Sequence, residues 1–185
     1  MNRSSFQPGP LADVDSSAAE DGRWTLVFVR DLRHPREKVW AALTEPSQLS
    51  EWSPYTADRN LGTAGDATLT MIDRDTTEDL PATVTRADAP ILLEYTLGSD
   101  LVRWELAATE SGTRLTLRHT VEGRDWVPKV AAGWHLCLDV AELLLDGRPI
   151  GPIRGEEARN YGWDELNKAY AEKLSIPATE LPEHD

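Results

Sequence analysis

The chain has 185 residues, 40% of them hydrophobic and 28% charged, which indicates a folded protein with one sizeable core. Its formal net charge is −13 and it has no basic cluster, so nucleic-acid binding is not expected. No apolar stretch is long enough to cross a bilayer, and the N-terminus lacks the apolar segment of a secretory signal. We therefore expect a cytoplasmic protein without a membrane span.

The N-terminal third predicts a tail, a strand and two short helices. Residues 1–22 are rich in Ser, Pro, Gly, Asp and Ala and show no period, so they predict a flexible tail or one ordered only by contact with the domain. Residues 23–32, RWTLVFVRDL, are rich in aromatic and β-branched residues and predict the first strand. Pro35 suits the first turn of a helix, which Pro46 ends, and a second short helix follows over residues 46–51.

A β pattern runs from residue 55 to residue 123. Apolar and polar residues alternate along successive segments that are separated by short turns, which predicts an antiparallel meander. One face of each segment is apolar, so one face of the sheet is expected to be covered. The segments are 55–60, 66–73, 79–86, 91–97, 101–109 and 113–122.

The covering element is predicted to be the long helix that follows. Pro128 opens it, Gly147 ends it after about Leu145, and a broad apolar stripe that includes Trp134 and Leu138 runs along it. We expect this helix to lie in the concavity of the sheet. Residues 23–147 would then form the domain. Residues 148–185 would form a linker, a helix at 161–174 and an acidic tail at 175–185, packed on the domain or trailing it.

Two segments resemble a known family. HPREKVWAALTEPSQLSEWSPY at 34–55 and AAGWHLCLDVAELLLDG at 131–147 resemble the START-like or SRPBCC superfamily, and most of all its branch related to the activator of the heat-shock-protein-90 ATPase. The resemblance covers about residues 23–147. It implies an α+β helix-grip fold, in which a curved antiparallel sheet of about seven strands wraps around a long C-terminal helix.

A helix grip of this kind implies a ligand cavity between the sheet and the long helix. Strand parity and helix spacing select its lining, with Tyr95, Trp104 and His119 as polar groups in an otherwise apolar wall. Trp52 is expected near the mouth. The alternative is that these side chains fill the interior and leave no cavity. The predicted lining consists of Leu69, Met71, Val84, Leu93, Tyr95, Trp104, Leu106, Leu117, His119, Trp134 and Leu138.

Other candidate groups favour structural interpretations. Cys137 lies in an apolar helical run, which is typical of a small buried side chain. His135, Asp139 and Glu142 share one helix face but do not match the zinc pattern, so we expect a solvated polar face. The acidic run at 73–79 does not match a calcium loop and predicts a solvated turn. The sequence therefore predicts no metal, no cofactor and no catalytic residue.

Three functions remain open. The first is binding of a small hydrophobic or aromatic molecule, such as a lipid, a polyketide-like compound or a metabolite. The second is a protein-interaction or stress-response module with a protein partner, which predicts an exposed apolar patch. The third is an enzyme of the polyketide cyclase or dehydratase type, for which only His119 and Tyr95 stand out. Oligomeric state is not predicted.

Overall fold

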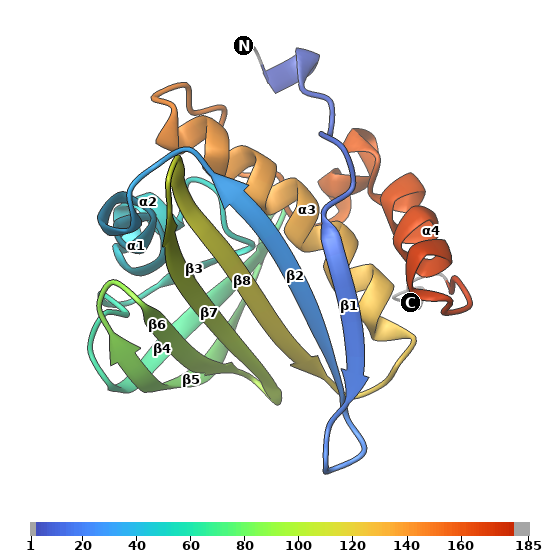
Figure 1. The fold of residues 1–185 in the computed structure, drawn as a ribbon, viewed down its shortest axis with the longest axis horizontal. Helices are drawn as coiled ribbons and strands as arrows, with labels where there is room; N and C mark the ends of the chain where they lie inside the picture. The colour runs from blue at the N-terminus through green and yellow to red at the C-terminus, as the bar shows by residue number, and fades with distance from the viewer. Residues whose placement is uncertain (1–2, 180–185) are drawn as a thin grey trace.

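The computed structural model, which describes residues 3–179, shows a curved sheet of eight antiparallel strands closed over one long helix (Figure 1). The order across the sheet is β1-β2-β8-β7-β6-β5-β4-β3. This confirms the predicted helix grip. The strands are β1 (Asp13–Ala18), β2 (Trp24–Leu32), β3 (Tyr55–Ala57), β4 (Gly65–Asp73), β5 (Thr76–Asp88), β6 (Leu92–Leu97), β7 (Asp100–Thr109) and β8 (Gly112–Val121).

The eighth strand comes from the segment that the sequence predicts to be a tail. Residues 13–18 form β1, which pairs with β2 from Asp13 opposite Val29 to Ala18 opposite Trp24. Before it, the short 3-10 helix η1 (Arg3–Ser5) leads to the buried Phe6. The segment has no strand pattern of its own, because its main stabilisation is backbone pairing with the edge of β2.

Two short helices, α1 (Arg36–Thr44) and α2 (Pro46–Leu49), connect β2 to β3 as predicted. Pro35 has φ −66° and stands just before α1, where a missing N–H costs no hydrogen bond. The N–H of Glu45 ends α1 by donating to Ala41 O at 2.9 Å, and Pro46 begins α2. These helices carry the chain across one end of the sheet, next to α3 (Trp126–Leu145) (Figure 1).

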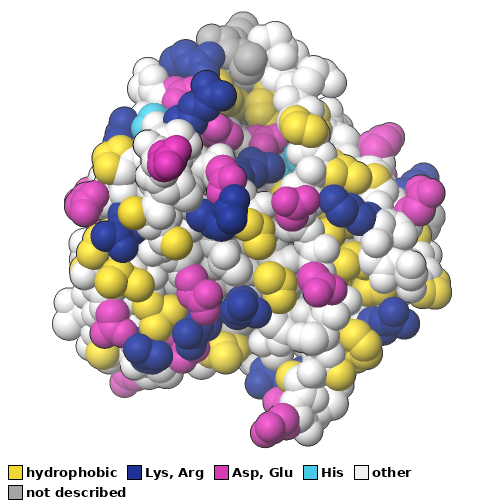
Figure 2. Space-filling model, viewed as in Figure 1, with side chains coloured by type: hydrophobic (Ala, Val, Ile, Leu, Met, Phe, Trp, Pro, Cys, Tyr) yellow, Lys and Arg dark blue, Asp and Glu magenta, His cyan; other side chains and the backbone are white. Residues whose placement is uncertain are grey.

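The predicted alternation of the strands holds. On β8, for example, Leu115 and Leu117 are buried while Arg114 and Arg118, on either side of them, are exposed. On the outer face, Arg103 pairs with Glu94 and Glu105, at 3.2 and 2.7 Å. Figure 2 shows basic and acidic side chains interspersed over the face seen in Figure 1, with hydrophobic ones dispersed among them. The other face of the sheet therefore supplies the core.

The long helix α3 lies in the concavity of the sheet, behind β2 and β8 in the view of Figure 1. It begins two residues before the predicted Pro128, which occupies the first turn, where no intrahelical N–H bond is needed. Residues are buried on all sides of this helix, among them Val127, Leu136 and Val140 as well as Trp134 and Leu138. The helix is therefore covered twice, once by the sheet and once from the other side.

That second cover comes from the two ends of the chain. The 3-10 helix η2 (Gly155–Tyr161) forms within the predicted linker, and α4 (Trp163–Leu174) follows and packs on α3 and beside β1 (Figure 1). Tyr170 of α4 is fully buried. Within residues 3–179, no helix is long and apolar enough to cross a membrane. The acidic tail expected at 175–185 lies outside the described residues from position 180 onward.

Candidate functional site

The structure buries the predicted lining residues between the sheet and α3. All of them are at most 4% exposed except Met71, which is partly exposed. Strand pairing sets several side by side, with Leu93 opposite Trp104 and Val84 opposite Tyr95. The residues thus belong to one interior region, formed by β4 to β8 and α3.

Three indole rings occupy the centre of this region. The ring centroids of Trp104 and Trp134 lie 5.2 Å apart, and those of Trp52 lie 6.0 Å from Trp104 and 6.4 Å from Trp134. The two contacts of Trp104 are edge-to-face, an arrangement that suits the aromatic quadrupoles, and the Trp52–Trp134 contact is tilted. Trp52, predicted near the mouth, is instead fully buried, and its indole N–H donates to Ala42 O at 2.9 Å. That bond to α1 holds the ring inside.

Two tyrosines form the polar part of the interior wall. The hydroxyls of Tyr55 on β3 and Tyr95 on β6 are 2.5 Å apart, and the indole N–H of Trp104 donates to Tyr95 at 3.0 Å. Burial raises the pKa of Tyr55 well above its ordinary value and that of Tyr95 to about 12. Both phenols therefore stay protonated at neutral pH. Their mutual bond uses one of the two protons, so the pair can offer the other to a further acceptor.

His119 is held by hydrogen bonds on both sides of its ring. The indole N–H of Trp134 donates to Nδ1 at 2.9 Å, and Nε2 lies 2.9 Å from Asp100 Oδ2. Because Nδ1 accepts, the proton belongs on Nε2, which donates to the carboxylate. The ring is 4% exposed. This is a satisfied histidine that joins α3 to the β6–β7 turn, and it can act on a bound molecule only if Trp134 moves.

Cys137 is buried in the same interior, as predicted. Its thiol lies 4.0 Å from Ile153 O, and burial raises its pKa to about 12. The thiolate, which is the nucleophilic form, is therefore strongly disfavoured.

The predicted solvated face of α3 is wrong for His135 and Asp139. His135 is fully buried, and Asp139 keeps a side-chain exposure of only 12%. The Asp139 carboxylate accepts hydrogen bonds from Arg30 of β2 and from the N–H of Gly9, the latter at 2.8 Å. His135 Nε2 lies 3.3 Å from Asp139 Oδ2, an electrostatic contact rather than an aligned hydrogen bond. The N-terminal segment covers this face, and Asp139 supplies an acceptor for its Gly9 N–H.

Tyr170 completes this polar cluster. Its hydroxyl accepts from the N–H of Ala12 at 3.0 Å and lies 2.6 Å from His135 Nδ1. Burial raises the pKa of Tyr170 to about 12, so its proton stays available to Nδ1. The cluster of Arg30, His135, Asp139 and Tyr170 therefore ties β2, α3, α4 and the N-terminal segment together. Among residues 3–179, no three His, Cys, Asp or Glu side chains are placed to hold a metal ion.

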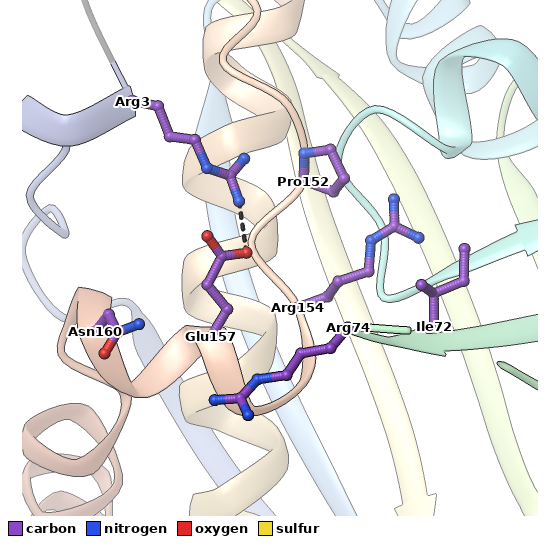
Figure 3. Close-up of a pocket in the computed structure, with 7 residues that line it drawn as sticks. All are labelled: Arg3, Ile72, Arg74, Pro152, Arg154, Glu157 and Asn160. Atoms are coloured by element: carbon purple, nitrogen blue, oxygen red, sulfur yellow. Dashed lines mark hydrogen bonds and ion pairs between the residues drawn. The ribbon is translucent and has the colours of Figure 1, made fainter. Parts of the chain in front are cut away.

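A separate cavity of about 500 Å³ opens at the surface, where η1, the end of β4 and the loop after α3 meet (Figure 3). Its walls contain Ile72 and Pro152 together with the charged side chains of Arg3, Arg74, Arg154 and Glu157. No predicted lining residue contributes to it.

The family model described as "Activator of Hsp90 ATPase homolog 1-like protein" matches residues 33–145. The chain belongs to this family. The match runs from just before α1 to the end of α3, and it confirms the resemblance of the segments at 34–55 and 131–147 to the START-like superfamily. A search of curated protein sequences found no match.

Solved structures share the fold. The crystal structure of CalU16 from Micromonospora echinospora is 18% identical, with a TM-score of 0.63 over 87% of this chain and 95% of that one. Protein MLL2253 from Mesorhizobium loti is 26% identical, with a TM-score of 0.59 over 66% and 97%. An AHSA1-like protein from Aeromonas hydrophila is 21% identical, with a TM-score of 0.57 over 66% and 92%. The chain is thus a helix-grip domain whose family and fold support ligand binding in general.

Several residues of these sites were missed by the sequence analysis. Tyr55 begins the short strand β3, where no alternation marks an inward side chain. Asp100 begins β7, directly after a polar turn whose sequence indicates a solvated segment. His135 and Asp139 did carry a signal, because their neighbours Leu136 and Val140 are apolar too, and a helix with apolar residues beyond one stripe is typically buried on more than one side. The cavity arginines lie far apart in the chain and form no motif.

Proposed function

We propose that this protein binds a small hydrophobic or aromatic molecule between the sheet and α3. The single observation that carries the proposal is the pair of phenols, Tyr55 and Tyr95, that meet inside an apolar wall. Burying polar groups costs desolvation free energy, and two phenylalanines would fill the same space without it. A few polar groups in an apolar lining are typical of ligand sites.

The phenol pair also suggests the ligand's polar group. One phenol proton can serve a further acceptor, so a carbonyl or ether oxygen on an aromatic body suits this wall. The rings of Trp52, Trp104 and Trp134 are in contact, so a ligand enters by separating them and replaces their mutual contacts with its own. Their fluorescence is then a direct reporter of binding.

A matched pair of probes tests this. 2-Acetylnaphthalene and 2-isopropenylnaphthalene have nearly the same shape, and only the first carries an oxygen acceptor. At a hundredfold excess over Kd, a bound ligand adds about 2.7 kcal/mol of stability. For a chain of this size that raises Tm by roughly 5–10 °C. We expect the ketone to raise Tm, to change tryptophan emission and to bind about tenfold more tightly than the alkene, the value of one hydrogen bond.

The double substitution Tyr55→Phe/Tyr95→Phe removes both phenol protons and should abolish this preference while both compounds still bind. Tyr161→Phe is the matched control, because Tyr161 lies at the end of η2 and packs on Phe6 rather than in the sheet–helix interior. If neither compound changes Tm or emission, or if the double variant keeps the preference intact, the proposal is wrong. The interior then serves packing alone.

A further inference from the structure

Three arginines converge on the surface cavity of an otherwise strongly acidic chain. Arg3 comes from η1, Arg74 from the turn after β4, and Arg154 from the loop after α3 (Figure 3). Glu157 is the one acidic side chain in the lining, so the lining carries three positive charges and one negative. The chain as a whole carries −13. This local excess of positive charge favours an anion.

Hydrogen bonds and ion pairs fix the rim of the cavity. Arg3 pairs with Glu157 at 2.7 Å and donates to Ile150 O at 3.2 Å. Arg74 pairs with Glu156 at 2.8 Å, although both of these side chains are more than half exposed. The backbone of the loop after α3 is therefore held from two sides, from η1 and from the β4–β5 turn.

Arg154 differs from the other two arginines. Its Nη2 donates to Ser50 O at 2.8 Å, but its Nη1 is buried and has no hydrogen-bond partner within the described residues. A buried charged donor without an acceptor is costly, so such groups usually find a partner. Burial, and further the positive charge of Arg3, lowers the pKa of Arg154. An anion beside Nη1 would supply the acceptor and relieve the repulsion between the two guanidinium groups.

We propose that this cavity binds a small organic oxyanion, a carboxylate or a phosphate. Its charged group bonds to Arg154 and Arg3, and its apolar body lies against Ile72 and Pro152. A guanidinium fork matches both kinds of oxyanion. A cavity of about 500 Å³ is of the size that holds a metabolite. This site lies outside the sheet–helix interior and does not depend on the function proposed for it.

Calorimetry at low ionic strength tests the site with benzoate, phenyl phosphate and benzyl alcohol. The three probes share an aromatic ring, and the first two distinguish a carboxylate from a phosphate. We expect at least one anion to bind with a Kd of about 1 mM or tighter and the neutral alcohol not to bind in that range. If neither anion binds, or if the alcohol binds equally well, the proposal is wrong.

Three single-charge substitutions sharpen the test. Arg154→Gln should weaken anion binding by about 10- to 100-fold, the range for a hydrogen bond to a charged group. Glu157→Gln should tighten it, because it removes the carboxylate that competes for Arg3. Arg159→Gln is the control, since Arg159 lies on η2 but not in the lining and pairs loosely with Asp164, at 3.9 Å.

Equal weakening in Arg154→Gln and Arg159→Gln would mean general electrostatic attraction and would overturn the proposal. If Arg154→Gln does not fold, Glu157→Gln decides alone, and weaker binding in that variant overturns the proposal. A failure here leaves the matched naphthalene test of the interior unaffected, because those probes carry no charge and the Tyr55→Phe/Tyr95→Phe variant changes another site.

Discussion

Replacing Asp139 by Asn should destabilise the fold strongly although Asp139 lies on no strand and in no apolar contact. The carboxylate and the guanidinium of Arg30 are only 12% and 11% exposed. In Asp139→Asn the positive charge of Arg30 stays buried, and one amide N–H faces another donor, either Arg30 or the N–H of Gly9. Breaking a fully buried ion pair costs roughly 3–5 kcal/mol, so a pair with this residual exposure should lose about 3 kcal/mol.

Urea unfolding followed by circular dichroism measures this loss. With m near 2–3 kcal/mol/M, a loss of about 3 kcal/mol lowers the midpoint by roughly 1–1.5 M. Amide exchange at Gly9 should rise as well, because its N–H loses a charged acceptor. Glu142→Gln, one turn further along α3, is the control and should change the midpoint little. If Asp139→Asn unfolds at the same urea concentration as this control, the polar cluster does not stabilise the fold and our reasoning fails.

The same carboxylate gives the prediction a pH dependence. Burial acts to raise the pKa of Asp139, but His135 and Arg30 outweigh burial and lower it below its ordinary value of 3.8. A lowered folded-state pKa contributes stability that is complete above the ordinary value and is lost as pH falls through the folded one. Below about pH 4 the native protein should therefore lose stability more steeply than Asp139→Asn, so the two unfolding midpoints should converge.

Two further predictions concern the interior and the cavity rim. Cys137, with its thiol pKa raised to about 12, should resist labelling by a disulfide reagent at pH 8 and react fully in guanidinium chloride; rapid labelling of the native protein would contradict its burial. Gly155→Ala should destabilise more than Gly147→Ala in thermal melts. Gly155 and Gly147 both have positive φ, +58° and +74° respectively, but only at Gly155 would a Cβ meet Asp73 Oδ1 at 2.1 Å. Equal losses of stability in the two variants would show that the loop at the cavity rim can shift to admit the methyl group.

The sequence predicts those parts of the fold that local residue patterns determine, and it does not predict those that depend on contacts between distant segments. Inward residues on β4 to β8, such as Leu69, Val84 and Leu117, follow from period-2 alternation, because a strand side chain can face only two ways. The strand β1 does not follow, because residues 13–18 are ordered by the edge they meet rather than by their own composition. The start of α3 differs by two residues for a similar reason, since proline is compatible with any position in the first turn.

The residues of the candidate sites also divide into those that local patterns select and those that only the packing brings together. Tyr95, Trp104 and His119 could be chosen from strand parity and Trp134 from helix spacing. The partners Tyr55 and Asp100, and the hydrogen bonds that join these side chains, depend on how the elements pack together. The cavity is the extreme case: Arg3, Arg74 and Arg154 lie on three elements that no local pattern connects.

The parts of the chain before residue 33 and after residue 145 lie outside the family match. The family match ends with α3, yet the second cover of that helix and most of the cavity walls come from residues before 33 and after 145. Asp139 and His135 lie within the match, but Gly9, Ala12, Arg30 and Tyr170, which they contact directly or through one another, lie outside it. The interior for which we propose ligand binding therefore lies within the family match, whereas the cavity for which we propose oxyanion binding depends largely on residues outside it. Loss of the N-terminal segment should remove Arg3, and so weaken anion binding in the cavity, while leaving the sheet–helix interior in place.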